Sequence, residues 1–400
     1  MANWARLQEQ LTGLPVVKRS RNSIHFDKGN GEIVANFSGA PCHYEENGEW
    51  KPIDTKLLLL PDGFYGSPHS DVKIHKDGRV KAGGYQQKSA LVDAKEGVVD
   101  GDKIVREFKF GTQYLYMKED GFRQETVITR PPTTAEAKYL IASESGELPS
   151  KYKRSDITAV DADGAVHEFV NLGQFKKWLD AAAYPVTIDP DFAGASDSVA
   201  VYGNNTNFAD ARSSSASAYT FGTAYKYLGW IYTAPNWRIY RNYHKFDTSS
   251  IGAESTVTQV NLTMTSINVY VSADYDIYIV KYDWSAFDED ITNTTNRETA
   301  WDALLTSDIE TWCNRLDLAV NTPETSGNLD TTWINKTGTT YYGIITEGDR
   351  TNVSAEANHL HRMCGVSYST ESYRPKLTVT YTTGSAGVPK HFLHYARMRG

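Results

Sequence analysis

The sequence predicts a mostly β protein, in which an antiparallel β domain is followed by a second β domain that carries a short helical insertion. Three observations predict this class. The 25 Tyr, 14 Phe and 9 Trp residues in the chain are types that favour strands. Several dipeptides supply the positive φ that a tight hairpin turn requires. They are Asn30-Gly31, Asn47-Gly48, Asp62-Gly63, Asp77-Gly78 and Asp120-Gly121.

The third observation is the alternation of apolar and polar residues, which is typical of a half-buried strand. It is clearest at Val257–Met264 and returns at Pro375–Tyr381, which we expect to be the last strand. The stretch from Arg238 to Ile251 is expected to be a strand that ends in the polar turn Asp247–Ser250. Aspartate and serine side chains can bond nearby backbone amides there and stop the strand.

Three short helices are expected. Asn3 caps one that runs to Leu11, and Asn171 caps another that runs to Leu179. The third, Glu298–Trp312, would place one apolar face against the second β domain. That face holds Trp301, Leu304, Leu305, Ile309 and Trp312. Helices this short are not stable alone, so each must pack on a neighbour.

The domain boundaries follow from composition. Proline, glycine and alanine in AAAYPVTIDPDFAGAS place a linker near residue 192. We therefore expect an N-terminal helix or arm at residues 1–22, an antiparallel β domain at 23–192, a second β domain at 193–383, and a linker with a basic aromatic tail at 384–400.

Composition also excludes several classes. A net charge of −8 argues against a protein that coats nucleic acid. No apolar run is long enough to span a bilayer, so we expect no membrane partner. The N-terminus, MANWARLQEQL, lacks the apolar core of a signal peptide. Cys42, Cys313 and Cys364 are odd in number and widely spaced, which predicts reduced thiols in a chain made in a cytoplasm.

The segments DSVAVYGNNTNF, YHKFDTSSI and YRPKLTVTYT lie between Asp197 and Tyr381. This region resembles the DNRLRE-type β-sandwich domains of bacterial surface proteins and of some tailed-phage virion proteins. Family domains usually have an Asn-aromatic-Gly turn, whereas here Ala209 follows Asn207-Phe208. Upstream, HYEENGEWKPIDTKL, GFRQETVI and AAAYPVTIDPDF resemble the β segment that precedes YD-repeat or sandwich regions in wall-associated proteins. The resemblance implies a jelly-roll-like β-sandwich and, in some relatives, carbohydrate binding. It assigns no catalytic residue here.

Two groups of side chains could carry chemistry. His359 and His361, with Cys364 nearby, would lie on one side of a strand, but no third metal ligand has matching spacing. We therefore expect ordinary histidines and no metal site. An acidic cluster could serve glycoside hydrolysis or bind calcium, but an acidic loop is the commoner explanation. The cluster comprises Asp283, Asp288, Glu289 and Asp290. We expect no catalytic residue. The one cofactor left open is a structural calcium ion, either at this cluster or at Asp197 and Asp210.

An aromatic series could bind sugars. Sugar rings present C–H faces that pack on exposed aromatic rings. The series comprises Trp230, Tyr232, Trp237 and Tyr240. The alternative is that these rings fill the core.

The C-terminal tail, VPKHFLHYARMRG, follows a Gly/Ser/Ala linker and is basic on an otherwise acidic protein. Aromatic and arginine side chains dominate many protein contacts, so the tail is a candidate docking element. Its candidate residues are Phe392, Tyr395, Arg397 and Arg399. A frayed terminus is the alternative.

Together these features favour a non-enzymatic structural protein of a tailed-bacteriophage virion, as a capsid decoration, collar or tail component that docks by its termini. It would be made in the cytoplasm of the host bacterium and located in the virion. The expected partners are other virion proteins and further copies of itself, with a host surface glycan as an additional candidate ligand. The alternative is a carbohydrate-binding module of a bacterial cell-surface or polysaccharide-degrading protein.

Overall fold

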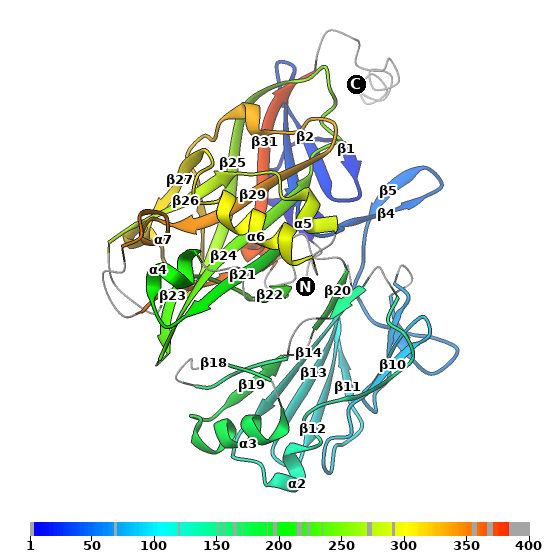
Figure 1. Cartoon of the computed structure of the whole chain (residues 1–400). Helices are drawn as coiled ribbons and strands as arrows, with labels where there is room; N and C mark the ends of the chain where they lie inside the picture. Colours follow the sequence, from blue (N-terminus) through cyan, green and yellow to red (C-terminus); the bar gives the residue numbers. More distant parts are fainter. Residues whose placement is uncertain are drawn as a thin grey trace. The chain divides into compact units, whose positions relative to one another are not determined.

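The described part of the chain is mostly β, as predicted, with 48% of its residues in strands and 17% in helices (Figure 1). The computed structural model describes residues 4–67, 70–118, 121–149, 152–154, 157–162, 166–169, 171–189, 191–194, 198–213, 218–221, 225–233, 235–269, 274–289, 293–353, 358–365 and 371–383. None of the helices in these ranges is long and apolar enough to cross a membrane.

The chain divides into two compact units, and the division differs from the expected one. The inserted unit is formed mainly by Pro52–Ser196, and the sandwich unit combines Trp4–Lys51 with the chain from Asp197 onward, apart from Thr220–Thr223. The boundary at residue 196 lies close to the expected linker near residue 192. Residues 23–51, however, belong to the sandwich unit and not to the first β domain. The reason is that their strand β3 (Glu32–Ser38) pairs with β31 (Lys376–Thr382), the last described strand of the chain.

The sandwich unit begins with α1 (Trp4–Thr12), β1 (Val16–Ser20), β2 (Ser23–Gly29), β3 (Glu32–Ser38), β4 (His43–Glu46) and β5 (Glu49–Pro52). It continues with β21 (Ser198–Asn205), α4 (Phe208–Ser213), β22 (Ala218–Phe221), β23 (Tyr225–Thr233), β24 (Asn236–Asp247), β25 (Thr256–Val269), β26 (Asp276–Lys281), α5 (Ser285–Glu289) and α6 (Thr294–Ala303). It ends with β27 (Ile309–Asn314), η1 (Arg315–Asp317), β28 (Thr322–Thr325), η2 (Thr331–Trp333), β29 (Thr339–Thr346), α7 (Glu347–Thr351), β30 (Asn358–Cys364), η3 (Glu371–Tyr373) and β31 (Lys376–Thr382).

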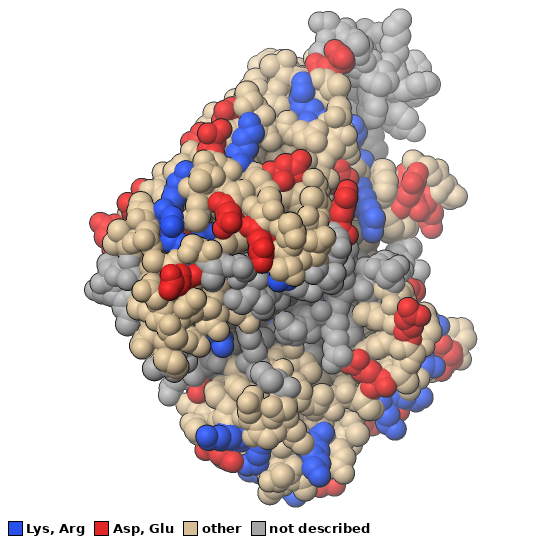
Figure 2. Space-filling model, viewed as in Figure 1, with Lys and Arg blue, Asp and Glu red and all other residues tan. Residues whose placement is uncertain are grey.

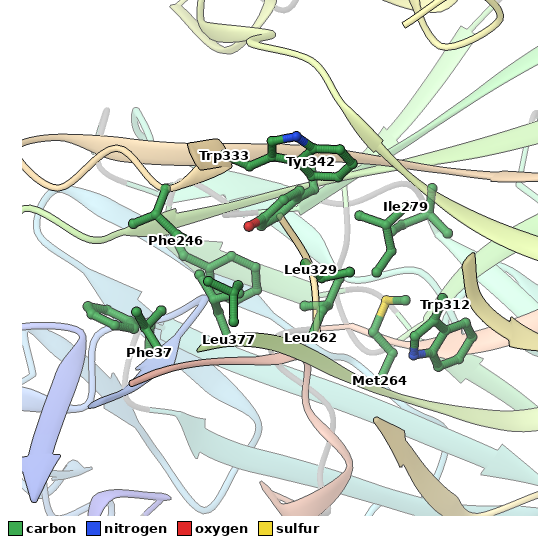
Figure 3. Close-up of a cluster of buried hydrophobic side chains, with 14 of the residues drawn as sticks. Phe37, Phe246, Leu262, Met264, Ile279, Trp312, Leu329, Trp333, Tyr342 and Leu377 are labelled. Atoms are coloured by element: carbon green, nitrogen blue, oxygen red, sulfur yellow. The ribbon is translucent and has the colours of Figure 1, made fainter. Parts of the chain in front are cut away.

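Apart from β4 and β5, which form a two-stranded sheet of their own, these strands form one hydrogen-bonded ladder in the order β1-β2-β3-β31-β25-β30-β23-β24-β29-β26-β27. In addition, β21 pairs with β24, β22 with β21, and β28 with β25. Its two halves share one core. Phe37 (β3), Leu262 (β25) and Leu377 (β31) lie against Phe246 (β24) and Tyr342 (β29), as Figure 3 shows. A ladder whose two ends bury their apolar faces against each other is sandwich-like, in keeping with the expected fold class.

The N-terminal helix packs on the sandwich unit. Trp4 is 1% exposed and joins Ile24 and Phe26 of β2 in a small core, while Gln8 Oε1 accepts a hydrogen bond of 2.9 Å from Asn36 Nδ2. The expected helix from Asn3 to Leu11 is therefore confirmed from Trp4 onward, and it is part of the fold.

The helix expected at Glu298–Trp312 is wrong in its second half. Trp301 and Leu304 are buried as predicted, but α6 ends at Ala303, and Ile309–Asn314 is the strand β27. The apolar residues fit a helical period, yet β27 completes the sheet beside β26 and Trp312 joins the sandwich core. Cross-strand pairing and burial therefore outweigh the local periodicity.

The inserted unit contains β6 (Leu58–Leu59), β7 (Tyr65–Gly66), β8 (Val72–Ile74), β9 (Arg79–Ala82), β10 (Tyr85–Lys88), β11 (Val98–Asp100), β12 (Lys103–Phe108), β13 (Gly111–Lys118), β14 (Gly121–Ile128) and α2 (Thr134–Ala137). It continues with β15 (Ser143–Ser145), β16 (Tyr152–Arg154), β17 (Thr158–Val160), β18 (Val166–Glu168), α3 (Leu172–Ala181), β19 (Val186–Asp189) and β20 (Asp191–Gly194). One sheet runs β15-β10-β9-β8-β7-β6, and a second contains β11-β12-β13-β14-β19-β17-β18.

Two cores hold the inserted unit together. Ile74 and Val80 of the first sheet pack on Leu115 and Met117 of the second. At the other end of the second sheet, Phe175 of α3 joins a separate core. Asn171 Oδ1 caps α3 by accepting from the Gln174 amide, as expected.

Candidate functional site

The four aromatic residues expected to form a sugar platform divide between two faces of the sandwich sheet. Trp230, Tyr232 and Trp237 share one face, because Tyr232 pairs directly with Trp237 and Trp230 pairs with Ile239. Tyr240 lies on the opposite face, where its ring contacts Tyr202 and Tyr227 at centroid distances of 5.4 Å. The series is therefore not one continuous surface.

Burial divides the series further. Trp230 is 1% exposed and stacks on His359 with ring centroids 4.5 Å apart and an interplanar angle of 11°. Tyr240 is 6% exposed, whereas Tyr232 is 39% exposed. Trp237 is half-buried. Trp230 and Tyr240 thus belong to the core, and Tyr232 and Trp237 are the members that an external ligand can reach.

A residue that sequence reasoning missed completes this surface. Asn205 of β21 pairs directly with Trp237 of β24, which in turn pairs with Tyr232 of β23. Directly paired residues of antiparallel strands share a face, so an amide, an indole and a phenol stand side by side across three strands. We call Asn205, Trp237 and Tyr232 the aromatic row. In the sequence, 27 positions separate Asn205 from Tyr232, and no local pattern relates them.

The helix α4 packs on this sheet face beside the aromatic row. Two residues before Asn205 on β21, Gly203 lies so close to α4 that an added Cβ would come within 2.1 Å of the Ala211 carbonyl oxygen. Phe208, the first residue of α4, packs edge-on between Trp230 and Trp237, at 5.4 Å from each. Asn207 Oδ1 caps α4 by accepting from the Ala209 amide at 2.8 Å. Trp237 therefore packs against the buried ring of Phe208.

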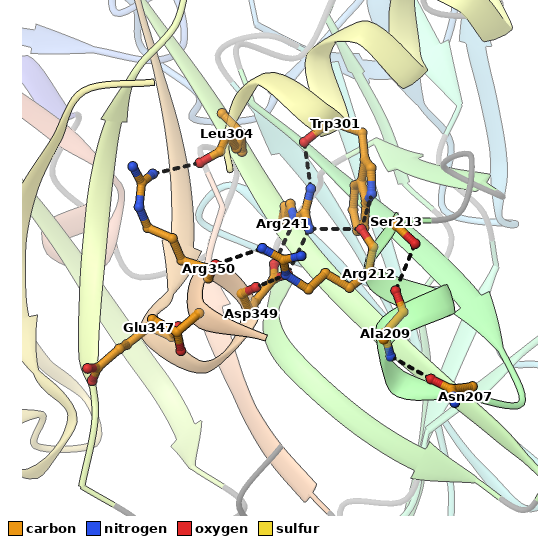
Figure 4. Close-up of polar contacts among 11 residues, drawn as sticks. Asn207, Ala209, Arg212, Ser213, Arg241, Trp301, Leu304, Glu347, Asp349 and Arg350 are labelled. Carbon is orange, nitrogen blue, oxygen red and sulfur yellow. Dashed lines mark hydrogen bonds and ion pairs between the residues drawn. The ribbon is translucent and has the colours of Figure 1, made fainter. Parts of the chain in front are cut away.

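On the same sheet face, a buried ion pair attaches the helices α6 and α7 to β24. Arg241 is 0% and Asp349 1% exposed, and two hydrogen bonds join them, Nε to Oδ2 at 2.6 Å and Nη2 to Oδ1 at 2.7 Å (Figure 4). Arg241 also donates to the Trp301 carbonyl at 2.5 Å and lies over the Trp301 ring at 3.7 Å. These contacts clamp α6 and α7 onto β24.

Two members of the acidic cluster, Asp283 and Asp288, are engaged in structural contacts. Both carboxylate oxygens of Asp288 lie 2.8 Å from Lys245 Nζ, and Asp283 Oδ1 accepts from the Ser285 amide at 2.9 Å. Asp290 and Asp197 lie outside the described residues. Within the described ranges, no three His, Cys, Asp or Glu side chains are grouped so that they could hold a metal ion. Figure 2 shows both acidic and basic side chains on the visible face.

The two histidines of β30 lie in the core. His359 stacks on Trp230, and His361 Nε2 lies 2.5 Å from the Tyr275 hydroxyl oxygen. Burial lowers the pKa of His361 to about 3, so its imidazole is neutral at pH 7. Cys364 is buried and, like Cys42 and Cys313, forms no disulfide.

A second polar group that sequence reasoning missed contains a serine and a histidine. His25 Nε2 lies 3.0 Å from Ser250 Oγ and 2.9 Å from Ser23 Oγ, while His25 Nδ1 lies 2.9 Å from the Tyr381 hydroxyl. A Ser–His contact of this length is the geometry of an activated nucleophile, so its chemistry needs testing. The sequence signal was the turn Asp247–Ser250, but nothing local linked it to β2.

The energetics of this group do not suit nucleophilic catalysis. Burial lowers the pKa of His25 to about 3, far below the range in which a general base works well at neutral pH. Burial also raises the pKa of Tyr381 to about 12, so the phenol carries no charge that would stabilise an imidazolium. The group joins β2, β31 and the turn after β24, and we assign it a structural role.

The expected docking residues Phe392, Tyr395, Arg397 and Arg399 lie outside the described residues. No protein-family model and no curated protein matches this chain. The function proposed below is therefore argued from the geometry of the described residues and from the sequence patterns.

Proposed function

We propose that the protein is a non-enzymatic structural component of a tailed-bacteriophage virion, in which a β-sandwich-like body carries a basic C-terminal docking segment. The supporting observation is the pairing of β3 with β31. Seven consecutive residue pairs, from Glu32–Thr382 to Ser38–Lys376, join the two strands. The N-terminal strands thereby cover the edge of β31, which would otherwise present open backbone groups.

This pairing changes how docking would work. The N-terminal residues from Trp4 onward are part of the sandwich unit, so they are not available as a separate arm. The basic residues 388–400 follow directly after β31 and a short linker, and they remain as the docking element of the proposal. A folded body followed in sequence by a cationic, aromatic segment is suited to attachment in a lattice of other proteins.

Labelling of phage particles tests this proposal. Antibodies against the protein should label intact particles in immunogold electron microscopy, and a chain that lacks residues 386–400 should be folded and soluble yet absent from particles. A variant with Arg397 and Arg399 changed to glutamine separates the contribution of charge from that of the aromatic residues. If the truncated chain enters particles at the wild-type level, the tail is not the docking element. If no particle is labelled, the proposal is wrong.

Carbohydrate binding is the second candidate function, and the exposure of Tyr232 beside Trp237 favours it. As a module of a surface or polysaccharide-degrading protein, the chain would bind glycans selectively without phage proteins. A glycan array separates the two candidates, because a purely structural protein gives no selective signal.

A further inference from the structure

We propose that the aromatic row, Asn205, Trp237 and Tyr232, is a binding site for neutral pyranose sugars of a surface polysaccharide. The proposal rests on the carbohydrate-binding candidate and assigns its residues and its sugar class. It also removes Trp230 and Tyr240 from the site, since both are buried.

The geometry of the row fits one face of a sugar ring. The rings of Tyr232 and Trp237 have centroids 4.9 Å apart and are tilted by 46°, which makes a shallow, angled surface rather than a flat wall. The C–H bonds of a pyranose carry the positive edge that the negative face of an aromatic ring attracts. Two rings at this separation can contact one pyranose or the junction of two.

Asn205 supplies the polar part of the site. Sugar hydroxyls both donate and accept hydrogen bonds, and a carboxamide can do the same with one side chain. Asn205 is half-buried, and its Oδ1 accepts from Thr206 Oγ1 at 3.3 Å, so the amide is held beside the indole. An amide next to the two tilted rings recognises hydroxyl positions, which an apolar patch alone does not do.

Charge decides the class of sugar. The row contains no ionisable cation or carboxylate, so it offers no ion-pair partner to uronic acids or sulfated sugars. Arg238, the neighbour of Trp237 along β24, is directed to the opposite face, where it lies 5.7 Å from the centre of the Tyr202 ring. Neutral pyranoses are therefore the matching ligands.

The packing of Phe208 against Trp237 favours binding. Phe208 holds Trp237 edge-on, and Phe208 in turn rests on Trp230, whose ring is fixed by its stack on His359. A ring that is already ordered loses little conformational freedom when a ligand binds. A single shallow site still binds weakly, so many copies on one particle would supply avidity.

Affinity electrophoresis of the full chain tests this site. Native gels would contain dextran, mannan, galactan or hydroxyethylcellulose as neutral polymers, and hyaluronate as a charged comparator. We expect retardation by at least one neutral polymer. Trp237→Ala and Tyr232→Ala should each weaken binding about tenfold, since a stacked ring contributes roughly that factor. Trp237→Phe, which keeps a ring, should bind more tightly than Trp237→Ala.

Tyr139→Ala is the matched control, because Tyr139 is an exposed tyrosine of the inserted unit, 47% accessible, and it should leave binding unchanged. If Trp237→Ala lowers the melting temperature, Tyr232→Ala and Asn205→Ala carry the test. Binding to neutral polymers that survives the double change of Trp237 and Tyr232 overturns the site but keeps carbohydrate binding. Retardation by hyaluronate alone overturns the sugar class. No retardation by any polymer overturns both the site and the carbohydrate-binding function.

Discussion

The buried ion pair between Arg241 and Asp349 gives a sharp prediction about stability. Asp349→Asn removes the negative charge while keeping the side-chain shape, and it leaves a guanidinium that is 0% exposed without a counterion. Breaking a fully buried pair in this way costs about 3–5 kcal/mol of unfolding free energy. In a unit of this size the melting temperature should fall by roughly 10 °C. Urea unfolding followed by tryptophan fluorescence is the assay, because every tryptophan except Trp178 lies in the sandwich unit.

The pair between Lys245 and Asp288 is the matched control. Its side chains are 17% and 21% exposed and its contacts are 2.8 Å long, so Asp288→Asn should cost no more than about 1 kcal/mol. Changing Arg241 to Met and Asp349 to Leu together should recover most of the loss, because an apolar pair needs no desolvation of charge. Equal, small losses for Asp349→Asn and Asp288→Asn would refute the argument from burial.

Three further predictions concern the fold. Acid should destabilise the sandwich unit. Burial lowers the pKa of three histidines from an ordinary 6.5 to about 3, namely His25, His244 and His361. The unfolded chain therefore binds more protons than the folded chain below pH 6.5. Each histidine should remove about 2 kcal/mol by pH 5, and a urea midpoint that stays constant from pH 7.5 to 5 would contradict this. Gly203→Ala should lower the free energy of unfolding by about 1–3 kcal/mol, because the added Cβ would clash with α4. Gly327→Ala is the control, since nothing lies within 4 Å of its added Cβ, and equal melting temperatures for the two variants would contradict the close packing at Gly203. Deletion of residues 1–38 should make the chain insoluble by uncovering β31, and a soluble product with native fluorescence would show that β3 is dispensable.

Local chemistry determined the features that the sequence predicted well. At Asn30-Gly31, φ is 55° and 79°, so both residues take the conformation that favours this dipeptide in a hairpin. The alternation at Val257–Met264 became part of β25, and the alternation at Pro375–Tyr381 became β31. These outcomes depend on each residue and its near neighbours, which is why one sequence sufficed.

The pairing of strands that are distant in the sequence was decided only by the tertiary structure. Alternation shows that a strand buries one face, but it does not identify the strand that pairs with it. For that reason the partnership of β3 with β31, across more than 300 residues, did not follow from the sequence. Trp312 fits both a helical and a strand period, and only the open edge of β26 selected the strand.

The candidate site follows the same division. Sequence alone identified aromatic residues near position 235 as a candidate surface, because ring-rich strands are visible in composition. It could not separate exposed rings from buried ones, since exposure depends on which segments pack on each face of the sheet. The cross-strand register places Asn205 in the aromatic row, and burial excludes Trp230 from it. Both are properties of the folded sheet, because they arise from contacts between segments that the chain order keeps apart.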